Sequence, residues 1–438
     1  MRRQMKFVFD LVLPQKMKTE FLKALPFWIA SLLVGLIAVG YTLLFGYSER
    51  LMHYVYKANG WLAFIIAPIA ILLAWVVVRR FAPEAKGSGI PQVMAAIEMS
   101  SNKNEEKVDR LLNGKIVLAK IGSSLLMVLG GAAVGREGPT IQISSSIFRM
   151  VNRSIPSDWP KLSKQSFILT GASAGLAAAF NTPLGGIIFA MEELARIHVR
   201  FFRTALFSAV IIAGLTAQGL LGPYLYLGYP KIGPINFIGV TGVVVTALLT
   251  GFGGASMSQL ILKALKKKSG IKTPAQNVIF LVLIGWLIAS IAQFISPAVL
   301  GSGKDLMQAV LFTDEKSVTL GTVLLRIAGP ILAFVTGGAG GVFAPSLAAG
   351  AGAGAWMSGI FELSGPGANI LILCGMVGFL TGVTRTPFTS AILVLEMTDR
   401  HSVIFYLMLA AMLSYFAAMT VSKHSFYDVL KKGYTNEE

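Results

Sequence analysis

The sequence predicts an all-α polytopic membrane protein, because of its composition and its long apolar runs. Of its 438 residues, 54% are hydrophobic and 13% are charged, whereas soluble domains carry about 25% charged residues. Mean hydropathy is +0.69. Several apolar runs approach the roughly 20 residues that a helix needs to cross a membrane, and their continuity favours helices over barrel strands. The runs are 25–46, 61–78, 205–221, 234–250, 277–295, 319–336, 369–383 and 403–420.

The positive charge lies between these runs rather than on one soluble face. The formal net charge is +17, which by itself could indicate a nucleic-acid partner. The basic residues instead cluster before the first run and again at 263–272. Since cytoplasmic loops are enriched in Lys and Arg, both termini are expected in the cytoplasm. No basic patch is interleaved with exposed aromatics, so nucleic acid is not expected as a partner.

Few residues suit metal binding or redox chemistry. The single cysteine, Cys374, lies in an apolar run, and the four histidines are scattered without metal-ligand spacing. No cofactor or metal is therefore expected. The apolar runs also hold no nucleophile–base pair, which disfavours a membrane enzyme.

The chain contains two related halves. The segment Gly131–Pro139 resembles Gly337–Pro345, and their prolines are 206 residues apart (345 minus 139). Farther along, Asn181–Glu192 resembles Arg385–Glu396, with an offset of 204 (387 minus 183). The same order and nearly the same offset indicate an internal duplication.

A weaker match joins 87–89 to 301–303. Both segments read Gly-Ser-Gly, with an offset of 214 (301 minus 87). The polar stretches 100–114 and 153–165 are interpreted as loops, and a short helix is expected at 425–432. The predicted divisions are a cytoplasmic segment at 1–24, a first transmembrane repeat at 25–222, a second at 223–420, and a final short helix with a cytoplasmic tail at 421–438.

Glycine and proline interrupt the hydrophobic sequence at four places. Helices that begin inside a membrane leave N–H groups without partners, which is tolerated only inside protein or beside a wet cavity. Duplicated transporters often bind their substrate at such breaks. The interruptions are at 87–91, 135–139, 182–186 and 337–345.

The first interruption, Gly87–Pro91, has two interpretations. Ser88 is well placed as a helix N-cap, with Pro91 in the opening turn. Alternatively, its hydroxyl and the neighbouring amides face a dehydrated anion at the positive helix end.

The second interruption places Arg136 and Glu137 between strongly apolar segments. Charges at that depth are costly and usually functional. They could form a structural ion pair, although adjacent residues do not face each other on a helix. Alternatively, a carboxylate at a helix N-terminus occupies the place of an anion and leaves when protonated, so that Glu137 is both gate and proton carrier.

The third interruption repeats the second with Phe343 at the position of Glu137. Glycines before Phe343 allow close approach of backbone to a ligand, and Pro345 opens a helix. Close packing of helices is the alternative for the small residues at 348–355.

Taken together, Gly-Ser-Gly-Ile-Pro, Gly-Arg-Glu-Gly-Pro and Gly-Val-Phe-Ala-Pro resemble the three selectivity motifs of the CLC chloride channel and transporter family, in its prokaryotic form without CBS domains. The resemblance implies an inverted-repeat fold with broken and tilted helices, a homodimer, and one anion pathway in each subunit. It also implies that Glu137 is the gating glutamate. The anion-binding residues that it implies are Ser88, Gly89, Ile90, Arg136, Gly138, Val342, Phe343, Ala344 and Tyr427.

The family contains proton-coupled exchangers and passive channels, and a second buried carboxylate distinguishes them. Glu193 matches the internal proton glutamate of exchangers, whereas Glu192 has a counterpart in Glu396. The alternative is an ordinary charged helix end, paired with Arg196. The resemblance favours exchange of chloride for protons over a gated chloride channel.

The same resemblance implies which anion is preferred and in which membrane the protein lies. Ser88 favours chloride, because nitrate-preferring members tend to have proline at that position. The lipid bilayer is the expected environment, in the plasma membrane and specifically a prokaryotic inner membrane.

Overall fold

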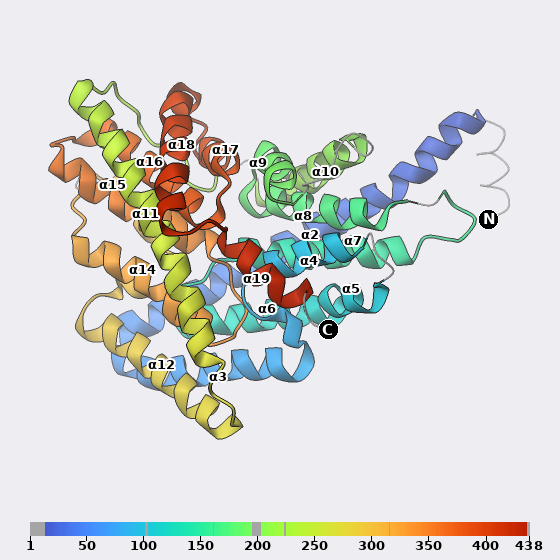
Figure 1. Cartoon of the computed structure of the whole chain (residues 1–438), viewed down its shortest axis with the longest axis horizontal. Helices are drawn as coiled ribbons and strands as arrows, with labels where there is room; N and C mark the ends of the chain where they lie inside the picture. Colours follow the sequence, from blue (N-terminus) through green and yellow to red (C-terminus); the bar gives the residue numbers. More distant parts are fainter. Residues whose placement is uncertain are drawn as a thin grey trace.

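The structure is a computed structural model that describes residues 14–100, 104–160, 162–194, 203–222, 225–314 and 316–435. Helices joined by turns and loops make up these parts of the chain (Figure 1), and the β-structure there is two isolated bridges between glycine-rich segments. The fold class predicted from the apolar runs is therefore confirmed.

The first half begins with a very long helix and continues through shorter ones. One of the shorter helices, Pro183–Phe189, continues into a π-helical turn at Ala190–Leu194. The α-helices are α2 (Gln15–Ala58), α3 (Ala63–Phe81), α4 (Ile90–Met99), α5 (Glu105–Leu111), α6 (Gly114–Leu129), α7 (Glu137–Arg153), α8 (Lys164–Phe180), α9 (Pro183–Phe189) and α10 (Arg203–Leu221).

The second half repeats this alternation of long and short helices. In Figure 1 most of the second half lies on the left, while its last helix, Phe426–Thr435, crosses back to pack against α4. Its α-helices are α11 (Phe237–Lys268), α12 (Pro274–Phe294), α13 (Lys304–Phe312), α14 (Leu320–Val335), α15 (Phe343–Ile360), α16 (Gly365–Thr384), α17 (Pro387–Thr398), α18 (Ile404–Val421) and α19 (Phe426–Thr435).

Eight helical segments in the described ranges are long and apolar enough to cross a membrane. Seven of them contain or overlap predicted runs. The run at 319–336 forms α14, which is shorter, and the eighth span is Glu105–Leu129, which the prediction missed because its first turns are charged. The chain is thus a multi-pass membrane protein.

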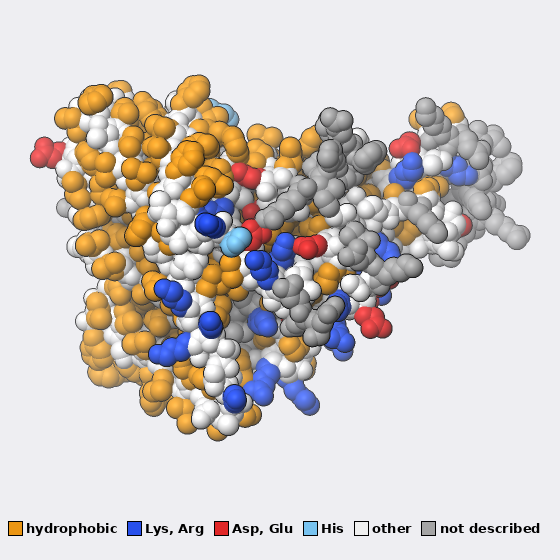
Figure 2. Space-filling model, viewed as in Figure 1, with side chains coloured by type: hydrophobic (Ala, Val, Ile, Leu, Met, Phe, Trp, Pro, Cys, Tyr) orange, Lys and Arg blue, Asp and Glu red, His pale blue; other side chains and the backbone are white. Residues whose placement is uncertain are grey.

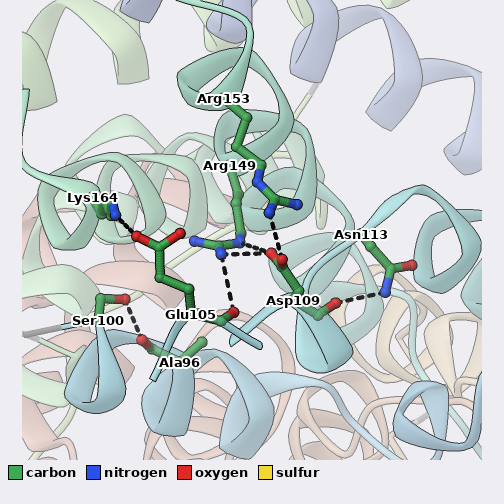
Figure 3. Close-up of polar contacts among 8 residues, drawn as sticks. All are labelled: Ala96, Ser100, Glu105, Asp109, Asn113, Arg149, Arg153 and Lys164. Atoms are coloured by element: carbon green, nitrogen blue, oxygen red, sulfur yellow. Dashed lines mark hydrogen bonds and ion pairs between the residues drawn. The ribbon is translucent and has the colours of Figure 1, made fainter. Parts of the chain in front are cut away.

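The predicted loop at 100–114 is partly wrong, because it contains α5. Charged side chains hold this helix to the end of α7 (Figure 3): Asp109 accepts a hydrogen bond of 2.8 Å from Arg149 Nε and forms an ion pair with Arg153. Glu105 pairs with Lys164 at the start of α8. The polar residues therefore tie three helix ends together instead of forming an irregular loop.

The two halves meet through reciprocal contacts. Glu192 accepts hydrogen bonds from the N–H groups of Phe388 (3.1 Å) and Thr389 (2.7 Å) at the start of α17. Its counterpart Glu396 accepts them from Leu184 (3.0 Å) and Gly185 (2.7 Å) at the start of α9. Such mutual capping is what a two-fold rotation between the halves produces, and it agrees with the duplication predicted from the sequence.

The surface separates apolar from basic regions. In Figure 2 hydrophobic side chains dominate the left part of the molecule, whereas Lys and Arg gather over the centre and lower part, near α11 and α19. The exposed apolar side chains include Leu283, Leu324 and Phe405. An apolar surface of this extent fits contact with lipid.

Candidate functional site

Three glycine-rich segments are hydrogen-bonded to one another at the centre of the protein. Gly135 and Gly341 donate N–H groups to each other's carbonyl oxygens over 2.8 and 2.7 Å. Gly87 donates to Gly338 over 2.9 Å and accepts from Gly340 over 3.0 Å. The three predicted motifs are therefore one structural unit, although they lie up to about 250 residues apart in the sequence.

Helices begin at all four predicted interruptions. These are α4 at Ile90, α7 at Glu137, α9 at Pro183 and α15 at Phe343. The first N–H groups of a helix have no intrahelical acceptor and carry partial positive charge. The starts of α4, α7 and α15 are brought together by the glycine contacts, which favours binding of a negative group between them.

Ser88 lies beside this junction, and of its two interpretations the one in which its side chain caps α4 is wrong. Gly89 is the N-cap, in the left-handed region with φ of 100°, and no side chain caps the helix. The Ser88 hydroxyl is buried and has no hydrogen-bond partner among the described residues. A methyl group on Gly138 would lie 2.3 Å from Ser88 Oγ. Only glycine therefore allows the start of α7 to approach this hydroxyl so closely.

Tyr427, in the first turn of α19, reaches the same place. Its fully buried hydroxyl lies close to Ser88 and has no hydrogen bond of ordinary geometry with a described residue. Its ring stacks on Phe343, with centroids 6.3 Å apart and an interplanar angle of 16°. A buried hydroxyl normally has a hydrogen-bond partner. The Ser88 and Tyr427 hydroxyls are therefore suited to donate hydrogen bonds to a bound anion.

Glu137 is the first residue of α7 and is buried, with 1% of its surface exposed. Its carboxylate lies near its own N–H group and near that of Ala344. One oxygen, Oε2, has no partner among the described residues. The carboxylate therefore occupies a place where backbone N–H groups from both halves converge.

Arg136 is not paired with Glu137. Its guanidinium lies near the Thr42 carbonyl (3.5 Å) and 5.8 Å from the ring centroid of Tyr226. No ion pair joins Arg136 to Glu137 among the residues described. The structural ion pair that the sequence left open is thus not formed.

The remaining predicted residues lie around the same junction. Phe343 and Ala344 are the first two residues of α15, Val342 is its N-cap, and all three are buried. Phe343 also contacts Phe189 edge-to-face at 6.1 Å. Ile90, fully buried, opens α4.

Glu193 lies in the π-helical turn after α9 and is 7% exposed. It is close enough to the Tyr427 hydroxyl to interact with it electrostatically, as is Glu137. Tyr427 therefore lies in the neighbourhood of both carboxylates. Arg196, the alternative partner of Glu193, is outside the described residues.

Two buried cations escaped the sequence analysis. Lys120 is fully buried and donates to the Gly87 carbonyl over 3.0 Å, and Arg326 donates to the Gly301 carbonyl over 3.1 Å. They are 206 residues apart (326 minus 120), the offset of the two prolines. That coincidence, a basic residue inside an apolar segment of each half, was the signal that could have identified them.

The described residues around the site include no metal-ligand cluster. In the described ranges, no group of three or more His, Cys, Asp or Glu side chains could hold a metal ion. Apart from the Lys120 ammonium, which is bound to the Gly87 carbonyl, the polar groups at the junction are hydroxyls, backbone N–H groups and single carboxylates. This chemistry suits a small anion and a proton.

Comparison with known proteins agrees with this chemistry. The sequence model of the family described as "Voltage gated chloride channel" matches residues 70–419. The H(+)/Cl(-) exchange transporter ClcA of Klebsiella pneumoniae (strain 342) is 29% identical over 410 residues, covering 89% of this chain and 84% of the relative. ClcA of Salmonella typhi is 30% identical over 361 residues, covering 78% and 72%.

Solved structures share the fold. A slow cyanobacterial Cl-/H+ antiporter superposes with a TM-score of 0.81 at 21% identity, covering 95% of this chain and 99% of the other. A CLC-type fluoride/proton antiporter gives 0.78 at 17% identity, covering 95% and 98%. The chain therefore shares the fold of these proteins, with broken helices meeting at a central site. The chain belongs to the voltage-gated chloride channel (CLC) family.

Proposed function

We propose that this protein is a secondary active antiporter that moves chloride across the membrane in exchange for protons. The observation that carries the proposal is the position of Glu137: a buried carboxylate beside the N–H groups of two helix starts, in the neighbourhood of two buried hydroxyls that have no hydrogen-bond partner among the described residues. The names of the relatives, which are exchangers, support antiport rather than a passive channel.

The anion binds between the Ser88 and Tyr427 hydroxyls and the helix starts that carry Ile90 and Phe343. Backbone N–H groups and hydroxyls replace its hydration shell without a fixed cation in direct contact. Binding of this kind is weak enough for release. When Glu137 is protonated it leaves the N–H groups that hold it, and a second anion takes its place.

Protons travel between Glu137 and Glu193, the two carboxylates that lie in the neighbourhood of Tyr427. Protonation of Glu137 opens the outer side of the pathway, and Glu193 exchanges protons with the cytoplasm. Because an anion enters the place that Glu137 leaves on protonation, chloride and the deprotonated carboxylate compete for one place. This competition couples the movement of chloride to the movement of protons in the opposite direction.

We further propose a homodimer in the plasma membrane of a prokaryote, with both termini in the cytoplasm. The basic clusters between spans support this orientation. The exposed apolar residues Leu184 on α9 and Phe388 on α17 support an interface beside the reciprocal carboxylate caps. Each subunit contains a complete set of the proposed anion-binding residues.

The test uses purified protein in liposomes loaded with chloride and placed in chloride-free buffer of impermeant anion. Outward chloride movement should drive proton uptake, recorded with a pH electrode, and a proton ionophore should abolish the pH change. Chloride efflux without proton uptake would reject antiport in favour of a channel.

A further inference from the structure

Two cations from different halves of the chain converge on one aromatic ring near Glu137. The Arg136 guanidinium lies 5.8 Å from the centroid of the Tyr226 ring, and the Lys304 ammonium lies 4.9 Å from it. Both side chains are half-buried. Lys304 is the first residue of α13, so the N-terminal end of that helix adds positive potential at the same place.

The Tyr226 ring between them has a fixed position. It is 3% exposed and packs edge-to-face against Phe180, with centroids 4.9 Å apart. The next residue, Leu227, donates its N–H to the carbonyl of Met397 at the end of α17 over 3.1 Å. The two cations therefore lie beside a ring whose own position is fixed by packing and by the neighbouring backbone.

The acidic groups near Lys304 are engaged elsewhere. Glu49 accepts hydrogen bonds from the N–H and hydroxyl of Ser302 over 2.8 and 2.7 Å. Asp305 lies 3.2 Å from His53 Nε2, and Glu137 lies near the N–H of Ala344. These carboxylates lower the positive electrostatic potential around Arg136 and Lys304, but none of them forms an ion pair with either cation in the described ranges.

Neither cation forms an ion pair with a residue in the described ranges. Arg136 Nε is in addition buried without a hydrogen-bond partner there. Cations that lie beside one aromatic ring gain from its quadrupole but repel each other, and Arg136 and Lys304 are close enough to interact in this way. A small anion between them would relieve this repulsion and supply the missing acceptor.

We propose that Arg136, Lys304 and Tyr226 form an outer docking site that holds a small monovalent anion before it replaces the Glu137 carboxylate. The proposal rests on the proposed function, which assigns this side to the outside. The site selects by charge and size, so bromide and nitrate should occupy it as well as chloride. Its effect is to concentrate anions at the mouth of the pathway.

The first experiment compares Lys304→Met with Lys57→Met in liposomes. Lys57 lies on the same side, one turn beyond the His53 that contacts Asp305, but it is exposed and does not touch Tyr226. Lys304→Met should raise the half-saturating chloride concentration about 3- to 10-fold, and Lys57→Met should leave it near the wild-type value. Impermeant salt should reduce the difference, because it screens exposed charges. Equal values for both variants would overturn the proposal.

The second experiment detects the anion directly. Crystals of wild-type protein grown in bromide should give an anomalous peak between the Arg136 and Lys304 side chains, and the Lys304→Met variant should lose it. A peak at Ser88 and Tyr427 alone would reject the outer site while leaving the central one intact. Conversely, an outer peak in a protein that shows no chloride-driven proton movement would uphold the docking site and reject the proposed antiport.

Discussion

The helix junctions of the two halves share a backbone frame but differ in the side chain at one position. Glu137 opens α7 in the first half, and Phe343 opens α15 at the corresponding place in the second. Glycines before each, Gly135 and Gly341, pair with each other through two hydrogen bonds. The duplicated frame brings the two helix starts together, while only one half carries a titratable group.

The two Gly-Ser-Gly segments differ in a similar way. The Ser302 hydroxyl is bound to Glu49 over 2.7 Å, whereas the Ser88 hydroxyl has no partner in the described part of the chain. Lys120 and Arg326, in contrast, hold the carbonyls of the two first glycines alike. The symmetric contacts stabilise the frame, and the asymmetric positions are those expected to act on substrate.

The largest effect is expected from Glu137→Gln. It removes the titratable group but keeps its shape, so coupled proton movement should fall about 100-fold or more, while chloride movement persists. Parallel recordings with chloride and pH electrodes measure both fluxes. Glu362→Gln, which changes an exposed carboxylate, should leave both fluxes unchanged. Proton coupling that survives Glu137→Gln would remove the functional distinction between the two junctions.

Glu193→Gln should also abolish proton movement and leave chloride movement, because it removes the proposed cytoplasmic relay. The reduction in proton flux is expected to be about 100-fold at neutral pH. The ratio of protons to chloride, recorded in the same liposomes, is the measurement. An unchanged ratio would make Glu193 an ordinary charged residue at a helix end.

Gly138→Ala tests the close approach of α7 to Ser88. Its methyl group would lie 2.3 Å from the Ser88 hydroxyl oxygen and 2.9 Å from the Ser88 carbonyl oxygen. Overpacking of this kind costs about 1–3 kcal/mol, and anion binding should weaken as the site is displaced. Calorimetric titration with chloride and thermal unfolding measure the two effects.

Gly122→Ala is the matched control, because nothing lies within 4 Å of the added methyl group on α6. It should bind chloride like the wild type. If Gly138→Ala also bound normally, the start of α7 would have more freedom than its contacts with Ser88 indicate.

Ser88→Ala and Ser302→Ala should have opposite consequences. Loss of a hydrogen bond to an anion at Ser88 costs about 1.5 kcal/mol, or roughly tenfold in chloride affinity, with little change in stability. Ser302→Ala should lower stability, since it leaves Glu49 with one donor fewer, and should preserve affinity. Chloride titration and thermal unfolding of both variants measure these effects. If Ser302→Ala weakened chloride binding as much as Ser88→Ala does, the comparison between the two segments would be contradicted.

The smallest effect on transport is expected where the halves are alike. Glu192→Gln and Glu396→Gln each weaken two charge-assisted backbone caps, at a cost of about 1.5–3 kcal/mol in stability. Glu192 also accepts a hydrogen bond from the Thr389 hydroxyl over 2.7 Å, so its replacement should cost slightly more stability, and the proton-to-chloride ratio should not change in either variant. A lower unfolding temperature for Glu396→Gln than for Glu192→Gln would contradict this ranking.

Much of this arrangement was predictable from the sequence, because the duplication is visible as similar segments at a nearly constant offset. The offset between Pro139 and Pro345 identified corresponding helix starts, and the charges beside Pro139 stood out against apolar surroundings. The pairing of Glu192 with Glu396 also indicated that Glu193 was the additional residue. Local signals of this kind need no knowledge of the fold.

Contacts between distant segments were not predictable. Ser88 fits an N-cap by sequence, but the left-handed Gly89 turns the chain and leaves the hydroxyl to face α7. Lys304 and Tyr226 carry no motif, and they meet Arg136 only because α13 and the segment after α10 fold to the same side. Their role depends on a juxtaposition that periodicity and spacing do not encode.

The reversal potential of the purified protein in planar bilayers, under opposed chloride and pH gradients, tests the central claim most directly. Antiport through Glu137 and Glu193 predicts a potential that moves with the pH gradient as well as with the chloride gradient. A potential that stays at the chloride equilibrium value while pH is changed would contradict the account and make the protein a chloride channel.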